Sequence, residues 1–143
     1  MKQLRTEVHI NAPTTVVWQI LRAFEEYPSW NPFVVHIEGD LKLAGNLKTT
    51  MMLNGKAQHF APKVMALEPG KKFEWLGKMP LGLFNGHHYF HLEPIGAEQT
   101  KFIHGEHFSG LLRGLIMRMI GAETLRSFEA MNAALKARAE AWQ

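Results

Sequence analysis

Three residues capable of acid–base chemistry, His88, His104 and Glu106, fall in two apolar stretches that alternate like β-strands. Successive side chains of a strand point to opposite faces, so residues two apart share a face. His88 then shares a face with Phe90, and His104 and Glu106 share a face with Phe102. If the two strands are neighbours, two imidazoles and a carboxylate meet on an apolar inner wall.

A carboxylate and an imidazole in apolar surroundings can hold the carbonyl or hydroxyl of a ligand, or move a proton. Ligand contact is the leading interpretation of His88, His104 and Glu106. Acid–base catalysis by one of them is the rival, and the catalytic residue stays open among the three. In a third interpretation they only satisfy one another, backbone groups or a buried water.

Other site chemistries find less support in the sequence. The chain has no cysteine, which excludes disulfides, thiol catalysis and thiolate metal sites. Its serines lack a nucleophile-elbow context, and its dispersed glycines form no phosphate-binding loop. His88, His104 and Glu106 would be the ligand set of a catalytic zinc. However, adjacent histidines such as His87 and His88 point to opposite faces of a strand. We therefore predict neither a metal nor a cofactor.

The elements that position these residues are short strands followed by one long helix. From Gly110 to Trp142 apolar residues recur at gaps of three and four, as on one face of an amphipathic helix. A helix is also expected from Thr14 or Thr15, as its cap, through Phe24. The pattern predicts strands over 4–10, 33–38, 47–53, 58–67, 72–77, 86–92 and 100–108. We therefore expect an α+β fold with a curved antiparallel seven-stranded sheet gripping the C-terminal helix.

Proline and glycine mark three interruptions. Pro62 inside the fourth expected strand indicates a bulge or an edge position. The segment 27–32 contains Pro28 and Pro32 and is predicted to be a compact turn that blocks further helix. The segment 77–86 is an apolar loop between glycines. It could form a mobile lid, fold onto its own core, or touch a membrane or partner with its tip.

Length and composition indicate one soluble domain over residues 1–143. Apolar residues make up 46% and charged residues 20% of the chain, and the net charge is +3. The basic residues are scattered, which argues against nucleic-acid binding. The apolar runs are too short to span a bilayer, and the N-terminus has no signal-peptide core. The cytoplasm is the expected compartment, and the oligomeric state stays open.

Several segments together resemble a known family. They are Val17-Trp18, Tyr27 to Phe33, Val64 to Pro69, Phe73-Glu74-Trp75, His88-Tyr89-Phe90 and Thr100 to Gly110. This pattern is similar to the START-like (SRPBCC) superfamily, in particular its polyketide cyclase/dehydrase-like branch. The resemblance implies a helix-grip fold, one or two short helices after the first strand, and a deep apolar cavity between sheet and helix. Members of the superfamily bind lipids, hormones, polyketides or quinones, and some catalyse cyclisation or dehydration.

The predicted function is binding of a hydrophobic small molecule: a lipid, polyketide, quinone or aromatic metabolite. The expected cavity has the usual size of a ligand site, about 300–1,000 Å³. Its walls are predicted to be Trp75, Phe90, Phe102, Met117, Phe128 and Met131, with His88, His104 and Glu106 orienting the ligand. One alternative is a cofactor-independent cyclase, dehydratase or isomerase that uses His104 and Glu106. Another is a non-enzymatic interaction module with a vestigial pocket.

Overall fold

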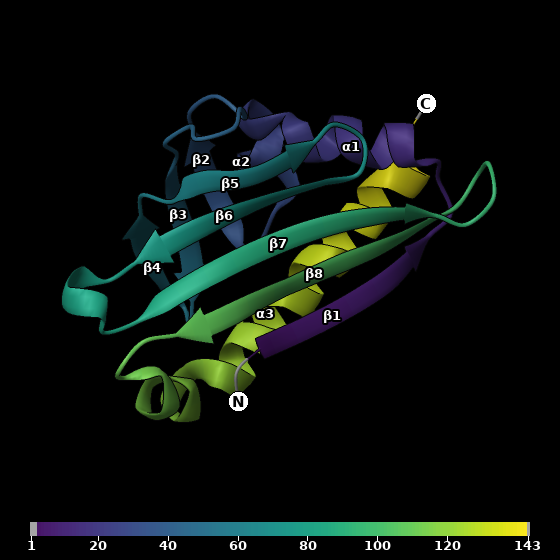
Figure 1. Cartoon of the computed structure of the whole chain (residues 1–143). Helices are drawn as coiled ribbons and strands as arrows, with labels where there is room; N and C mark the ends of the chain where they lie inside the picture. Colours follow the sequence, from purple (N-terminus) through teal and green to yellow (C-terminus); the bar gives the residue numbers. More distant parts are fainter. Residues whose placement is uncertain (1–2, 143) are drawn as a thin grey trace.

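The computed structural model describes residues 3–142, which form an antiparallel β structure wrapped around one long helix (Figure 1). The strands are β1 (Gln3–Ile10), β2 (Val34–Glu38), β3 (Lys48–Leu53), β4 (Lys56–Phe60), β5 (Lys63–Glu68), β6 (Lys72–Lys78), β7 (Asn85–Pro94) and β8 (Thr100–Ser109). The helices are α1 (Thr14–Arg22), α2 (Tyr27–Trp30) and α3 (Arg113–Glu140), with 3₁₀ turns η1 (Phe24–Glu26) and η2 (Pro80–Gly82).

The strands form two hydrogen-bonded groups. A five-stranded sheet has the order β1-β8-β7-β6-β5, and a three-stranded sheet has the order β2-β3-β4. In the larger sheet β7 and β8 pair so that His88 lies directly opposite Glu106 and Phe90 opposite His104. The expectation that these polar residues come from neighbouring strands is therefore confirmed.

The strand count between residues 3 and 142 is eight, so the prediction of seven was wrong by one. The expected strand over 58–67 is two strands, because the ladder breaks between Phe60 and Lys63. Pro62 lies in the break and has no N–H with which to continue the ladder. The chain changes partner there: β4 pairs with β3, whereas β5 pairs with β6.

The region after β1 also differs in detail from its prediction. The prediction of Thr14 or Thr15 as the N-cap was wrong. The helix α1 begins at Thr14, and its N-cap residue is Pro13, without a side-chain capping bond. The predicted turn at 27–32 contains the short helix α2, with Pro28 in its first turn. Proline fits there because the first helical N–H groups have no intrahelical partner.

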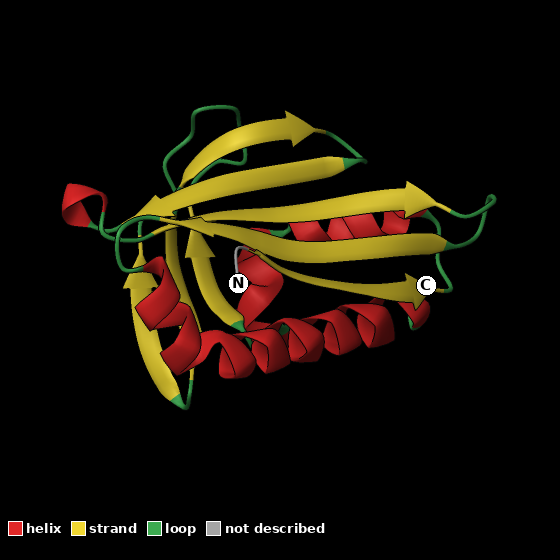
Figure 2. Cartoon of the chain, turned by 60° about the horizontal axis from the view of Figure 1, so that its bottom comes forward, coloured by secondary structure: helices red, strands yellow, loops and turns green. Residues whose placement is uncertain are grey.

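The long helix α3 runs along one face of the five-stranded sheet, against β1 and β8 (Figure 2). Its second half is the part that enters the core, because Phe128, Met131 and Leu135 are fully buried. In its first half Leu115 and Met119 are exposed, although they continue the same apolar spacing. Over residues 3–142, no helix has both the length and the apolar character needed to cross a membrane.

Large aromatic side chains fill the space between the sheet and α3. Phe73, Phe90, Phe102 and Phe128 have at most 1% of their surface exposed. Phe90 contacts Phe73 with ring centroids 4.7 Å apart, and Phe102 at 6.2 Å. Rings in such tilted or offset contacts pack densely and leave little void. The middle of the helix–sheet gap is therefore a packed core.

Candidate functional site

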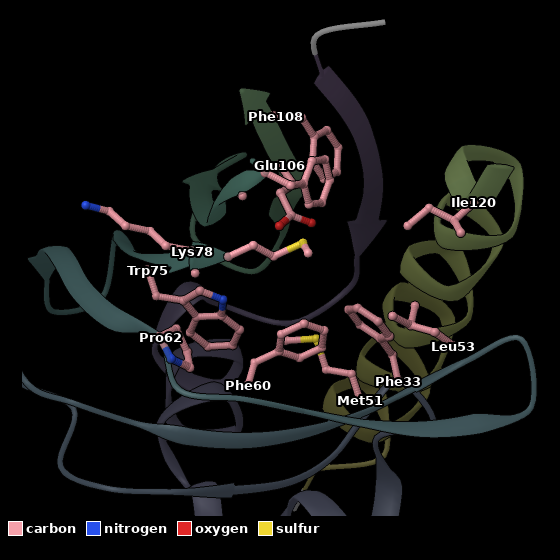
Figure 3. A pocket seen from close by; sticks show the side chains of 14 residues that line it. Phe33, Met51, Leu53, Phe60, Pro62, Trp75, Lys78, Glu106, Phe108 and Ile120 are labelled. Atoms are coloured by element: carbon pink, nitrogen blue, oxygen red, sulfur yellow. The ribbon is translucent and has the colours of Figure 1, made fainter. Parts of the chain in front are cut away.

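A small apolar pocket lies where the three-stranded sheet faces the end of the larger sheet (Figure 3). Its volume is about 110 Å³. It is lined by Phe33, Met51, Leu53, Phe60, Pro62, Trp75, Gly77, Lys78, Met79, Phe84, Gly86, Glu106, Phe108 and Ile120. Among these residues Lys78 and Glu106 carry charge, and the carboxylate of Glu106 points toward the middle of the group in Figure 3. The site is thus a hydrophobic recess with a carboxylate at its inner wall.

Of the nine residues predicted to contact a ligand, Trp75 and Glu106 line this pocket. The other seven lie behind it, in the packed core or on the inner side of α3: His88, Phe90, Phe102, His104, Met117, Phe128 and Met131. Each of these seven is at most 7% exposed. The structure therefore buries seven of the nine predicted residues in the protein interior and leaves Trp75 and Glu106 in the pocket wall.

The pocket is smaller than the expected 300–1,000 Å³ because rings occupy the predicted hollow. The imidazole of His104 stacks on Phe128 with centroids 4.2 Å apart and an interplanar angle of 13°. Phe90 contacts the same imidazole at 4.8 Å, and Phe33 contacts it at 6.1 Å. The space behind Phe102 and His104 is solid, and the recess lies nearer to Glu106 and Phe108.

A buried hydrogen-bond network fixes the orientation of His104. Its Nδ1 lies 2.9 Å from Asn132 Oδ1, and Asn132 Nδ2 donates to Thr6 Oγ1 at 2.7 Å. The Thr6 hydroxyl donates in turn to the backbone carbonyl of His104 at 2.8 Å. The Thr6 hydroxyl has one proton, and that proton is used in the bond to the carbonyl. Thr6 Oγ1 must therefore accept from the Asn132 amide nitrogen, which leaves Asn132 Oδ1 facing His104 as an acceptor. His104 therefore carries its proton on Nδ1.

The same reasoning assigns the protons of His88. His88 Nε2 and His104 Nε2 are 2.7 Å apart. Complete burial and the neighbouring His88 ring hold the pKa of His104 well below its ordinary value, despite the opposing Asn132 hydrogen bond. Neutral His104 can then only accept at Nε2, so His88 donates from its own Nε2. With that proton placed, Nδ1 of a neutral His88 is a bare acceptor.

The bare nitrogen faces Glu106. His88 Nδ1 lies 3.4 Å from Glu106 Oε1. Within the described chain it has no hydrogen-bond partner, so the two groups are close but not aligned for a hydrogen bond. A carboxylate and a nitrogen lone pair attract each other only when a proton lies between them. The two groups therefore lie side by side at the wall of the pocket without a hydrogen bond between them.

Gly86 makes room for the Glu106 side chain. A Cβ added to Gly86 would overlap Glu106 Oε2 and lie 3.0 Å from Glu106 Cδ. Gly77 pairs with Gly86 across β6 and β7, yet a Cβ added to Gly77 would meet no atom within 4 Å. The absence of a side chain at Gly86 thus accommodates the Glu106 carboxylate, and the absence of one at Gly77 leaves open space in the pocket.

The outward histidines of β7 have a different partner. Glu74 accepts from His87 at 2.7 Å and from His91 at 2.6 Å on the outer face of the sheet. Partial burial raises the pKa of Glu74, but these two hydrogen bonds outweigh it and leave the pKa below its ordinary value. Among residues 3–142, no group of three or more histidine, aspartate or glutamate side chains is placed to hold a metal ion.

Most of the remaining pocket wall was not predicted from the sequence as ligand-contacting. The apolar segment 77–86, which the sequence analysis singled out, supplies part of it, including Met79 and Phe84. Phe33, Leu53 and Phe60 carried no such signal, because their role depends on how the small sheet folds over the large one. Asn132 and Thr6 were missed because they meet across 126 positions of the chain.

Comparison with known proteins identifies the family. Residues 1–140 match the family described as "Polyketide cyclase / dehydrase and lipid transport". The chain belongs to this family. The START-like (SRPBCC) assignment and the helix-grip fold inferred from the sequence are thereby confirmed. No curated protein matches the sequence.

Solved structures of other START-like proteins share the fold of this family member. Zhui aromatase/cyclase from Streptomyces sp. R1128 superposes with a TM-score of 0.80 at 15% identity, covering 97% of this chain and 93% of its own. A START superfamily protein from Mycobacterium smegmatis gives 0.76 at 20% identity and covers 98% of both chains. Truncated norcoclaurine synthase from Thalictrum flavum gives 0.74 at 12% identity, covering 99% and 95%. At these identities the likeness concerns the fold.

Proposed function

We propose that this START-like protein binds a hydrophobic small molecule, such as a lipid, polyketide, quinone or aromatic metabolite. The observation that carries the proposal is the composition of the pocket wall, which is aromatic and aliphatic except for Lys78 and Glu106. Ligand sites in proteins combine such an apolar lining with a few well-placed polar groups. The family description, which includes lipid transport and polyketide cyclisation, agrees with this ligand class.

The pocket volume limits what enters it without rearrangement. A dry apolar cavity of about 150 Å³ accommodates benzene, and this pocket measures about 110 Å³. One ring or one acyl end therefore fills it, and the rest of a larger ligand extends through the mouth. Met51 and Met79 in the wall are flexible and can move apart for a larger ligand.

Glu106 is the group that would hydrogen-bond to the polar end of the ligand. Its side chain is 18% exposed, whereas that of His88 behind it is 1% exposed. A hydroxyl on the ligand can donate to the carboxylate, and a carbonyl can accept from its protonated form. We therefore expect a ligand with an oxygen function on its buried end.

A fluorescence titration with N-phenylnaphthylamine, a neutral apolar probe, tests the proposal. The variant Gly77→Leu places an isobutyl group where a Cβ meets open space, so it fills the pocket without a clash on entry. The matched control is Ala57→Leu, which places the same isobutyl side chain at an exposed position of β4 outside the pocket. We expect saturable enhancement with the wild type and Ala57→Leu, and its loss with Gly77→Leu. Equal binding by all three proteins, or by none, contradicts the proposal.

The position of the Glu106 carboxylate in the pocket wall, beside His88, favours a second candidate function, acid–base catalysis on the bound molecule. Glu106 would take a proton from a carbon next to a ligand carbonyl, leaving an enolate, and would return it at another position. Return of the proton to another carbon completes an isomerisation. In a cyclisation the enolate carbon instead attacks a second carbonyl of the ligand, and in a dehydration the enolate expels a neighbouring hydroxyl, which leaves as water with the proton held by Glu106. His88, held by neutral His104 and Asn132, would position the carboxylate and share its proton.

Deuterium exchange into β-tetralone, an aromatic ketone with acidic C–H bonds, separates the two functions. If Glu106 is the base, protein in D₂O accelerates the exchange seen by NMR. Glu106→Gln, which keeps the shape of the side chain, should then abolish the acceleration while N-phenylnaphthylamine still binds. Exchange that survives Glu106→Gln refutes the catalytic role, and an absence of accelerated exchange leaves binding alone as the function.

A further inference from the structure

The mouth of the pocket is surrounded by apolar side chains that point into solvent. Leu81 is 90% exposed, Leu111 83% and Met119 74%. We call the following group the rim patch: Met79, Leu81, Leu111, Leu112, Leu115, Met119 and Ile120, each of them at least 36% exposed. Single exposed apolar residues are normal, but contiguous groups of them mark contact surfaces.

The two segments that carry the rim patch are bonded to each other. The amide of Leu111 donates to the carbonyl of Gly82 at 3.2 Å, and the amide of Leu112 donates to that of Leu83 at 2.8 Å. Figure 1 shows η2 and the start of α3 at the same end of the molecule. The rim patch is therefore one continuous surface built from a loop and the first turns of a helix.

The backbone of Leu81 holds its side chain outward. Leu81 has a φ of 61°, in the left-handed region that a leucine rarely adopts. Such a conformation persists when surrounding structure enforces it, and it is found mostly at functional segments. Here the neighbouring bonds at Gly82 and Leu83 supply that support.

Within the two segments that carry the rim patch, every charge is positive. The adjoining carboxylates are Glu123, which pairs with Arg126, and Glu106, which lies in the pocket wall. The segments 77–86 and 110–122 contain Lys78, Arg113 and Arg118, and neither segment contains an aspartate or glutamate. None of the ion pairs formed by residues 3–142 uses one of these three cations. The chain as a whole is only mildly basic, at +3, so this local excess is a property of the patch.

We propose that the rim patch docks onto the surface of a membrane that contains anionic lipids. Leucine and methionine side chains would enter the boundary between headgroups and acyl chains, and the three cations would meet the headgroups, as in interfacial membrane-binding surfaces. Met79 and Ile120 belong both to the rim patch and to the pocket wall. Docking would therefore place the pocket mouth against the bilayer, where an apolar ligand can pass without crossing water.

Charge complementarity favours a lipid surface over a second copy of the chain. In a two-fold dimer built on this surface, the same patch of each copy faces itself. Like charges of Lys78, Arg113 and Arg118 would then face one another. The adjoining carboxylates do not offset them, because Glu123 pairs with Arg126 and Glu106 lies in the pocket wall. An anionic bilayer presents the opposite charge to all three.

Vesicle flotation tests the docking. The vesicles are phosphatidylcholine alone or an equimolar mixture of phosphatidylcholine and phosphatidylglycerol. The variants Leu115→Asp and Met119→Asp change exposed side chains, and Leu43→Asp is the matched control because Leu43 is 65% exposed but lies outside the rim patch. Arg118→Gln removes one cation. Light scattering on the same samples gives the oligomeric state.

We expect binding to the mixed vesicles and much less to phosphatidylcholine alone. Each aspartate variant should weaken binding on the order of tenfold, as expected for losing one buried apolar side chain. Arg118→Gln should weaken it about fivefold, the usual contribution of one cation near an anionic surface. Leu43→Asp should bind like the wild type.

Three results would overturn the docking proposal: no binding to the mixed vesicles, binding unchanged by the rim-patch variants, or equal binding to both vesicle types. A wild-type dimer that becomes monomeric in Leu115→Asp and Met119→Asp would show instead that a second copy covers the patch. Because N-phenylnaphthylamine binding is measured without lipid, failure of the docking and failure of the pocket can be told apart.

Discussion

The position of the Glu106 carboxylate can be tested by adding one methyl group to each of two paired glycines. Gly77 and Gly86 are opposite each other in adjacent strands, and neither has a positive φ. Gly77→Ala places its Cβ in open space, whereas Gly86→Ala drives it into the end of the Glu106 side chain. The two variants therefore differ mainly in whether they meet this carboxylate.

The expected magnitude follows from two opposing contributions. Replacing glycine with alanine at a compatible position stabilises by about 0.4–1 kcal/mol through the unfolded chain, and both variants gain this. Overpacking costs about 1–3 kcal/mol, and only Gly86→Ala incurs it. Because the obstacle is the far end of a flexible side chain, we expect a difference near the lower limit, about 1 kcal/mol.

Urea unfolding measures the difference, and a double mutant assigns its cause. Gly86→Ala should be less stable than Gly77→Ala in the wild-type background. When Glu106→Ala is combined with each glycine variant, the difference in stability between the two should disappear, because the carboxylate that the Gly86→Ala methyl group meets is removed. Equal stability of the two variants in the presence of Glu106, or a difference that survives its removal, would refute the placement of the carboxylate.

Three further predictions concern the network and the outer face of the sheet. Asn132→Leu strands the buried Nδ1–H of His104 and should lower the free energy of unfolding by about 1–3 kcal/mol, measured in urea. His104 has its ordinary pKa of 6.5 in the unfolded chain, whereas its pKa in the folded protein is much lower. At pH values below 6.5, the free energy of unfolding of the wild type should therefore decrease by up to about 1.4 kcal/mol for each pH unit. Unfolding titrations of His104→Gln should lack this contribution, and an equal slope would contradict the assignment. Gly105→Ala should be more destabilising than Gly86→Ala in thermal unfolding, because its Cβ meets the Tyr89 ring and, at 2.7 Å, the backbone oxygen of Leu4.

Local pattern was sufficient to predict most of the fold. Strand alternation placed His88, His104 and Glu106 inward and on neighbouring strands, because side-chain direction depends only on parity along a strand. The interruption at Pro62 was predicted as a bulge or an edge position within one strand. In the structure it separates two strands, β4 and β5, each at the edge of its sheet. A missing N–H predicts an interruption, but whether the chain then changes sheets depends on contacts far along the sequence.

The pocket could not be located from the sequence because its volume is the small remainder left by many large side chains. The prediction that Phe102, His104 and Phe128 enclose a hollow named residues that do meet, but they fill that space themselves. Strand alternation predicts to which face of the sheet a side chain points, but it does not predict how far that side chain lies from the helix opposite. The wall formed by Met51, Leu53 and Phe60 depends on the angle at which the small sheet closes over the large one.

The hydrogen-bond partners of the buried His104 side chain could not be predicted from the sequence either. The sequence suggested a ligand-binding or proton-transfer role for His104, but Asn132 occupies its Nδ1 and His88 occupies its Nε2. Asn132 lies on α3 between apolar neighbours, and nothing in the helical pattern distinguishes it from an exposed polar residue. Glu106 is left as the group of the predicted trio that reaches the pocket.

Native mass spectrometry of the protein purified from its own cells shows whether the pocket holds a ligand. The wild type and Gly77→Leu are compared under non-denaturing conditions, with Ala57→Leu as the control. We expect a bound small molecule on the wild type and on the Ala57→Leu variant, and no bound molecule on the Gly77→Leu variant. A ligand retained by Gly77→Leu would place the binding site elsewhere, and a wild type that is empty and also rejects N-phenylnaphthylamine would contradict the claim.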